Sequence, residues 1–178
     1  MFPRPLRVCD SRGFTIGELI IVVLVITVLG ALALPLLKQA RMSSNESSAI
    51  ASMRSIVGAQ ASYASFNLGF AESLDALARR CSGMTDAFIS QDLNRNGAVR
   101  NGYVFTVGPG RGAAAKKNDC NGVPTQTSFY GSASPQIPRD TGTRAFAVNP
   151  TSIIWQNSTP TPPAEPFVVG GTVSLVAK

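Results

Sequence analysis

A long apolar stretch near the start of the chain constrains the fold more than any other feature. It runs from Phe14 to Leu37 and carries no charged residue between Leu19 and Leu37. As an α-helix it would extend about 36 Å at about 1.5 Å per residue, more than the hydrocarbon thickness of about 30 Å in a bilayer. Residues 14–37 are therefore predicted to form a transmembrane helix, and the folded domain is expected to follow it.

Residues 1–13 precede this stretch and have the character of a removable leader. Three arginines make the segment basic, and it has no apolar core of its own. A secretory signal peptide is cut after its apolar region, whereas the processing-like junction here, Arg12-Gly13 followed by Phe14, lies before it. The leader is expected to be cleaved while the apolar helix is kept.

The junction and the start of the helix form one pattern, R-G followed by F-T-I-G-E-L and an apolar run as far as Pro35. Over roughly Arg12 to Arg41, this pattern resembles the N-terminus of type IV pilins and the related pseudopilins. The resemblance implies that a prepilin peptidase cuts after Gly13 and methylates the new amino terminus at Phe14. It also implies that Glu18 is used in assembly. The implied product is a homo-oligomeric helical filament, built by inner-membrane machinery and serving adhesion, motility or related surface functions.

The physical properties of Glu18 support a special role independently of the resemblance. A carboxylate near an apolar zone is costly, and such groups are usually paired or functional. Cleavage would create a positive partner, the amine of Phe14, in the same chain or in a neighbour that packs slightly offset along a filament. The alternative is that Glu18 only favours a helix N-terminus through the helix dipole.

The composition limits the functions that the chain can have. Its 178 residues leave room for one helix and one domain, and 16 Lys and Arg against 10 Asp and Glu form no dense basic run. The absence of histidine removes Ser-His-Asp and Cys-His catalysis and His-bearing zinc sites. No carboxylate spacing indicates a hydrolase. We expect neither an enzyme nor a cofactor or metal site.

Three cysteines are present, and Cys9 would leave with the leader. The remaining pair, Cys81 and Cys120, is expected to form a disulfide in an exported domain, closing a loop of about 40 residues. Two buried free thiols are the alternative, because sequence separation alone does not show that the two residues meet.

After the apolar run, residues 38–66 are predicted to continue the helix in amphipathic form. Gly30 and Pro35 favour a bend or local melting before this part, and Asn67-Leu68-Gly69 is typical of a glycine-ended helix. Apolar residues recur at spacings of three and four, which indicates a stripe that packs on a soluble domain. These residues are Met42, Ala49, Ile50, Met53, Ile56, Val57, Ala61 and Ala64.

Residues 67–157 are predicted to form a globular α+β head. A short helix is expected over 71–80, with Leu74 and Leu77 facing inward. Short apolar runs bounded by turn residues predict strands at 103–107, 127–133, 144–149 and 152–156. The predicted fold is a long hydrophobic-then-amphipathic helix packed on a small antiparallel sheet of about four strands, as the resemblance to pilins also implies.

A calcium-loop pattern begins within the head. Residues 92–97, DLNRNG, match the opening half of D-x-N-x-N-G, but Tyr103 stands where the loop would end in a bidentate Glu. A tight turn that leads into a strand is the favoured interpretation, and calcium binding stays open.

Residues 158–178 form a tail that opens with a proline-rich run, predicted to be extended and flexible. An edge strand over 167–177 is weakened by Gly170-Gly171. Asn157-Ser158-Thr159 fits a glycosylation sequon, which leaves modification open.

The predicted function is that of a structural filament subunit, held in the inner membrane by a single span before assembly and extracellular or periplasmic afterwards. A pseudopilin of a type II secretion system is the nearest alternative, since it shares every N-terminal residue used above. A third possibility is a minor pilin that binds DNA or a surface through basic residues of the head. These residues are Arg111, Lys116, Lys117 and Arg139.

Overall fold

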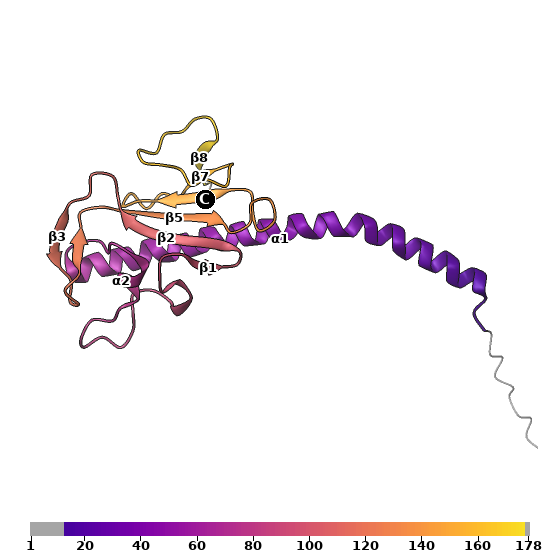
Figure 1. Ribbon diagram of the computed structural model, residues 1–178, viewed down its shortest axis with the longest axis horizontal. Helices are drawn as coiled ribbons and strands as arrows, with labels where there is room; N and C mark the ends of the chain where they lie inside the picture. Colours follow the sequence, from indigo (N-terminus) through magenta and orange to yellow (C-terminus); the bar gives the residue numbers. More distant parts are fainter. Residues whose placement is uncertain (1–12, 177–178) are drawn as a thin grey trace, which may run out of the picture. The chain divides into compact units, whose positions relative to one another are not determined.

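The computed structural model describes residues 13–176 (Figure 1). Helix α1 (Ile16–Asn67) continues without interruption through Gly30 and Pro35, so the local melting considered at Pro35 does not occur. The chain divides into two compact units, one up to Lys38 and one from Gln39 onward, which we call the head. In the first unit every described side chain is exposed, and α1 is long and apolar enough to cross a membrane.

Within the head, α1 packs against the domain through a stripe with alternating spacings of three and four residues. The predicted members Ala49, Met53 and Ile56 are buried. Ala61 is exposed and Met42 and Ala64 are only half-buried, so their predicted inward positions were wrong. Four polar residues also lie in the buried stripe, where each forms hydrogen bonds with other parts of the head. They are Glu46, Gln60, Tyr63 and Asn67.

The end of α1 differs in detail from the predicted glycine stop. Leu68, not Gly69, takes the left-handed backbone conformation, with φ 61°. Gly69 is required for another reason: a Cβ atom there would lie 2.4 Å from the Thr125 hydroxyl oxygen. The next residue, Phe70, exchanges two backbone hydrogen bonds with Gln126 (2.9 and 2.8 Å), which turns the chain back toward the domain.

A short second helix follows, as expected. Helix α2 (Leu74–Ala78) begins at Ser73, whose hydroxyl accepts a hydrogen bond from the Ala76 N–H, and it buries Leu74 and Leu77 completely. The chain then forms the 3-10 helix η1 (Gln91–Leu93) and a turn that leads into strand β1 (Ala98–Arg100).

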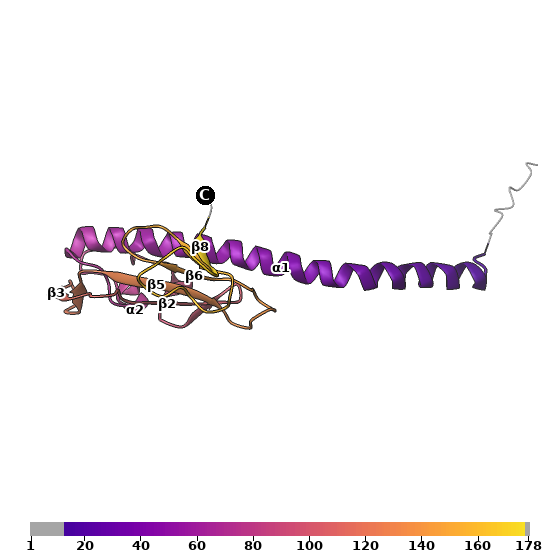
Figure 2. The same cartoon turned by 90° about the horizontal axis from the view of Figure 1, so that it is seen from above.

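The main sheet has six strands rather than about four, all antiparallel, in the order β1-β2-β5-β6-β7-β8. Figure 2 shows α1 lying along one face of this sheet. Strand β1 was not predicted, because three residues are too few to show a period-two pattern. Strand β8 lies within residues 167–177, where an edge strand was considered. The other strands are β2 (Tyr103–Pro109), β5 (Phe129–Pro135), β6 (Ala145–Val148), β7 (Trp155–Asn157) and β8 (Val173–Leu175).

A separate two-stranded sheet is formed by β3 (Ala115–Asn118) and β4 (Pro124–Gln126). Strand β3 is exposed at all four residues. The hairpin is anchored to the end of α1 by its turn, where Asp119 accepts a hydrogen bond from the Tyr63 hydroxyl (2.7 Å).

The proline-rich tail is not the flexible linker that its composition indicated. The Tyr130 hydroxyl donates to the Pro163 carbonyl oxygen (2.6 Å), and the Phe167 ring stacks on Trp155 with centroids 5.3 Å apart. Neighbouring residues of a strand point to opposite faces, and Phe146 belongs to the core beneath α1. The fully buried Ala145 and Ala147 therefore lie on the opposite face. The segment 158–172 covers that face of the sheet. Covering it is favourable because it removes apolar and aromatic side chains from water.

The predicted disulfide between Cys81 and Cys120 is present, with Cα atoms 5.5 Å apart. It joins the segment after α2 to the turn between β3 and β4. This segment and turn contain little buried apolar surface of their own. The bond therefore holds two weakly packed parts of the head together.

We predict that Cys81→Ser/Cys120→Ser lowers the free energy of unfolding of the head. The bridge spans 39 residues, and a loop of that size restricts the unfolded chain by roughly 4 kcal/mol in the loop-entropy model. Urea unfolding followed by the fluorescence of Trp155, the one tryptophan, measures the difference. Equal midpoints for the variant and the unreduced wild type would contradict the prediction.

Candidate functional site at the start of the long helix

The first turn of α1 is closed by a reciprocal pair of hydrogen bonds between Thr15 and Glu18. The Thr15 hydroxyl accepts from the Glu18 N–H (3.2 Å), while the Glu18 carboxylate accepts from the Thr15 N–H and hydroxyl (both 3.0 Å). This arrangement is a capping box, which satisfies backbone donors that a helix start leaves without partners. Sequence reasoning missed Thr15, although the T-x-x-E spacing is visible in the chain.

The capping box bears on the two interpretations of Glu18. In the single chain the carboxylate stabilises the helix start, as the helix-terminus interpretation requires. The group is nevertheless exposed, so its capping role does not prevent an approach by a second charged group. An ion pair with the Phe14 amine stays a prediction that needs a processed neighbour.

The proposed cleavage point is accessible. Gly13 and Phe14 precede the helix in an unpaired backbone, and the Phe14 side chain is 82% exposed. The leader residues 1–12 lie outside the described residues. An exposed junction outside regular helix meets the geometric need of a protease.

The apolar stretch from Leu19 to Leu37 has no partner within the described chain. Its Leu, Ile and Val side chains are about half exposed or more wherever they are described. Burying each large apolar side chain contributes about 1.5–3 kcal/mol, so a run of this length gains tens of kcal/mol from an apolar environment. Lipid or other apolar helices would provide such an environment.

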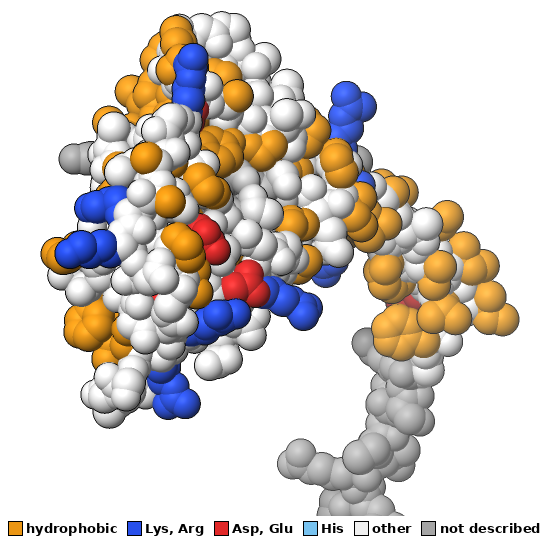
Figure 3. Space-filling view, turned by 60° about the vertical axis from the view of Figure 1, so that its left-hand side comes forward, with side chains coloured by type: hydrophobic (Ala, Val, Ile, Leu, Met, Phe, Trp, Pro, Cys, Tyr) orange, Lys and Arg blue, Asp and Glu red, His pale blue; other side chains and the backbone are white. Residues whose placement is uncertain are grey.

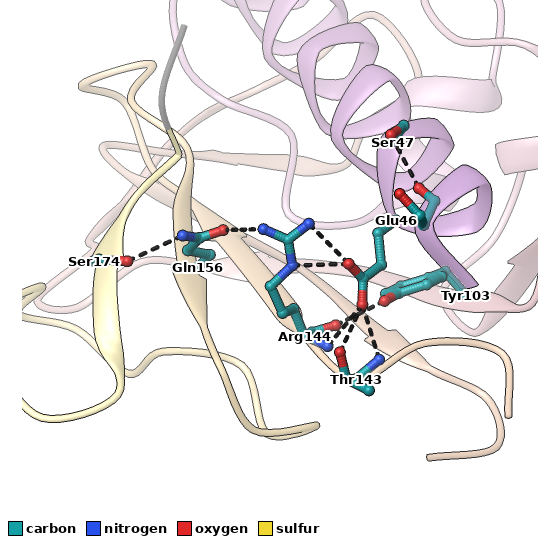
Figure 4. Close-up of polar contacts among 8 residues, drawn as sticks. Glu46, Ser47, Tyr103, Thr143, Arg144, Gln156 and Ser174 are labelled. Carbon is teal, nitrogen blue, oxygen red and sulfur yellow. Dashed lines mark hydrogen bonds and ion pairs between the residues drawn. The ribbon is translucent and has the colours of Figure 1, made fainter. Parts of the chain in front are cut away.

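A second polar cluster, which sequence reasoning also missed, attaches the main sheet to the part of α1 that lies within the head (Figure 4). The Glu46 side chain is buried and accepts hydrogen bonds from the Thr143 N–H and hydroxyl (both 2.9 Å) and from the Arg144 N–H (3.1 Å). Its other oxygen binds the Arg144 guanidinium through Nε and Nη2, each at 2.8 Å. Five donors thus converge on one helix carboxylate.

The network extends from Glu46 across the sheet. The Arg144 Nη1 donates to the Gln156 side-chain oxygen (2.8 Å), and the Gln156 amide donates to the Ser174 hydroxyl (3.0 Å). The Tyr103 hydroxyl donates to the Arg144 carbonyl oxygen (2.7 Å). One carboxylate on α1 is therefore connected to β2, β7 and β8 and to the two residues that directly precede β6.

The electrostatics of this cluster favour the charged form of Glu46. Burial raises the pKa of its carboxyl, but the hydrogen bonds from Thr143 and Arg144 outweigh burial and leave that pKa below its usual value of 4.5. The negative charge in this partly dry site is stable because donors satisfy both oxygens.

The four basic residues considered for DNA binding do not come together. Lys116 donates to the Leu68 carbonyl at the end of α1. The loop that carries Arg139 contacts Asn45 near the other end of the head's helical part, through the Thr141 carbonyl (2.9 Å). Asn45 and Leu68 are about 35 Å apart along a helix. Hence Arg111, Lys116, Lys117 and Arg139 do not form one surface.

The calcium-like segment is occupied by internal contacts. Asp92 forms an ion pair with Arg100 (3.1 Å), and the Asn96 side-chain oxygen accepts from the Leu74 N–H (3.2 Å) and the Val107 N–H (3.0 Å). Among residues 13–176, no group of three or more Asp, Glu or Cys side chains gathers in a metal-holding arrangement. The segment is the tight turn before β1.

Comparisons with known proteins returned no match. No protein-family model, no curated protein and no solved structure is significantly similar to this chain.

We predict that Glu46→Gln destabilises the head at neutral pH by about 2–3 kcal/mol, below the 3–5 kcal/mol of a fully buried pair because Arg144 is partly exposed. Because the pKa of Glu46 is lowered on folding, its stabilisation is complete above pH 4.5 and is lost as the pH falls through the folded-state pKa. Urea midpoints of the two proteins should therefore converge in acid.

Asp86→Asn, at an exposed carboxylate, provides the control and should change stability by less than about 0.5 kcal/mol. A Glu46→Gln penalty that persists undiminished well below pH 4 would show that the carboxylate charge is not what stabilises the contact.

Proposed function

We propose that this chain is a subunit of a type IV pilin-like filament, assembled through its N-terminal helix. The observation that carries the proposal is the exposed apolar half of α1, which begins at an accessible Gly13-Phe14 junction and bears Glu18 at its start. The other half of the same helix belongs to the core of a folded head. Such a chain has one part suited to polymerisation and one part suited to display on a surface.

The apolar half of α1 suits two successive environments. A bilayer covers it in the waiting subunit, which places a single span in the inner membrane. Apolar helices of neighbouring subunits cover it in a filament, outside the membrane in an extracellular or periplasmic location. The two environments are similar in polarity, so the transfer costs little hydrophobic free energy, and specific contacts decide its direction.

Glu18 supplies such a contact in the proposal. Without a partner, a carboxylate among apolar helices is unfavourable by several kcal/mol. The methylated amine of Phe14 from an adjacent subunit offers a positive partner, and prepilin peptidase creates that amine by cutting after Gly13. Processing thus makes the subunit competent for assembly.

We predict that protein extracted from membranes begins at Phe14 and carries one extra methyl group. Intact-mass and peptide mass spectrometry measure both features. Gly13→Leu should block cutting and leave the full-length chain in the membrane, since the bulky side chain stands at the cleavage position. A terminus at Met1 in wild-type protein, or one after Leu37, would contradict the proposed processing.

We further predict that Glu18→Gln abolishes most filaments while subunit level and membrane location stay normal. Glutamine retains the hydrogen bond of the capping box but not the charge. Thr15→Val is the matched control, because it removes the capping hydroxyl and keeps the charge. It should cost the helix start about 1 kcal/mol and leave assembly largely intact.

Electron microscopy of cells labelled with an antibody to the head counts the filaments of both variants. Wild-type filament number and length with Glu18→Gln as the only subunit would rule out the ion pair. Loss of filaments with Thr15→Val alone would show that helix capping, rather than charge, is what assembly needs. Long surface fibres identify a pilus, whereas their absence from cells with processed subunit identifies a secretion pseudopilus.

A further inference from the structure

Two large apolar side chains are exposed at the point where α1 ends. Phe66 is 55% exposed and Leu68 is 69% exposed. The Leu68 backbone has φ 61°, a conformation that favours glycine, so a leucine at this place is not explained by turn geometry. The Leu68 side chain also contributes nothing to the core, which leaves its role to be sought at the surface.

The disulfide gathers four basic side chains beside these two. Arg79 and Arg80 directly precede Cys81, while Lys116 and Lys117 lie just before Cys120. Since the two cysteine Cα atoms are 5.5 Å apart, both basic pairs occupy one region, and all four side chains are exposed.

Direct contacts link one residue of each basic pair to this region. Lys116 donates to the Leu68 carbonyl, and the Arg80 Nη1 donates to the Thr85 carbonyl (3.2 Å). Thr85 and Phe66 line the same open cleft, together with Met84 and Phe88. We call this surface the helix-end patch. Its members are Phe66, Leu68, Arg79, Arg80, Lys116 and Lys117.

Nearby carboxylates do not neutralise the helix-end patch. Asp119 is buried and accepts a hydrogen bond from the Tyr63 hydroxyl, so its carboxylate faces the interior of the head. Asp86 lies on the cleft and Glu72 is half-buried near Tyr63, which leaves four basic groups against two acidic ones. Figure 3 brings this end of the head forward and shows Lys and Arg predominating over Asp and Glu, with apolar side chains between them.

We propose that the helix-end patch is a docking surface for an anionic lipid membrane. Lys and Arg bind the phosphate groups of such a surface, while Phe66 and Leu68 enter the boundary between headgroups and acyl chains. Single-stranded nucleic acid would instead favour a series of aromatic rings for base stacking, and Leu68, the more exposed of the two apolar members, has no ring. The proposal concerns the head alone and does not depend on filament assembly.

The test uses the full chain, anchored by its own apolar helix in nanodiscs of neutral phosphatidylcholine. Loaded nanodiscs are mixed with vesicles containing roughly 30% phosphatidylglycerol, and the bound fraction is measured by co-sedimentation. We expect binding at least about tenfold stronger than to pure phosphatidylcholine vesicles, decreasing as salt rises from about 0.05 M to about 0.5 M. Equal binding to both kinds of vesicle, or no binding to either, overturns the proposal.

The basic part is tested with Arg79→Gln/Arg80→Gln/Lys116→Gln/Lys117→Gln. Each basic side chain at an anionic surface contributes about fivefold in affinity, so the variant should bind at least about 100-fold more weakly. A control with the same net charge replaces four exposed arginines elsewhere and should lose less than about fivefold. Its changes are Arg54→Gln, Arg95→Gln, Arg111→Gln and Arg139→Gln. Equal losses in the two variants would show a net-charge effect and overturn the site.

The apolar part is tested with Phe66→Ser/Leu68→Asn, since asparagine tolerates a positive φ. Both side chains are largely exposed, so the head should fold, as urea unfolding can verify. We expect binding about tenfold weaker with its salt dependence retained. Binding of a fluorescent single-stranded oligonucleotide through the same basic residues, without binding to anionic vesicles, would assign the surface to nucleic acid and reject the lipid.

Discussion

The contact between Glu46 and the Thr143-Arg144 segment sets how the main sheet packs on the part of α1 that lies within the head. Apolar stripes alone tolerate small slides and rotations, because one methyl group can replace another at little cost. A buried carboxylate does not, since loss of its donors leaves an unsatisfied charge. Gln60 acts similarly further along, exchanging hydrogen bonds with the Ala71 carbonyl (3.0 Å) and N–H (2.9 Å). Polar pairs thus fix the register in which the apolar residues pack.

The two halves of α1 illustrate opposite solutions to the same problem. In the head, inward positions include polar residues whose partners are far away in sequence, such as Glu46 and Arg144, 98 positions apart. In the half before Lys38 the described residues 13–176 supply no partner; every turn is apolar and only the first turn carries a carboxylate. The first half can therefore change partners, whereas the second half is committed to one.

The features that sequence could predict are those with local signals. The apolar run, the inward Leu74 and Leu77 and the strand starting at Tyr103 follow from periodicity. The cysteine pair follows from the exported context that the N-terminus indicates. Glu46 could not be predicted as a buried residue, because helical periodicity counts apolar side chains and its donors come from the other end of the chain. The T-x-x-E spacing of Thr15 and Glu18 indicates a capping box, but the charge of Glu18 led to a predicted role in assembly instead.

Two further differences between the sequence predictions and the structure, at β3 and in the tail, have a common cause. Strand β3 (Ala115–Asn118) is exposed throughout, so alternation gives no signal, and its pairing with β4 depends on the disulfide and on Asp119. The tail has the composition of a linker, but Tyr130, Trp155 and Phe167 lie close enough in space to hold it on the sheet. Composition describes the freedom of an isolated segment, whereas these segments are ordered by surfaces formed elsewhere.

The strand order of the main sheet has a consequence for how the chain reaches its native state. Each strand pairs with the strand that precedes it in the sheet and in the sequence, with only the small β3-β4 hairpin inserted between β2 and β5. A chain that emerges from its N-terminus onward can add strands one at a time against α1, and Cys120 is available before β5 has emerged. No strand waits for a distant partner, which shortens the time that an unpaired edge is open to aggregation. The last addition, β8, completes the sheet only after residues 173–175 have emerged.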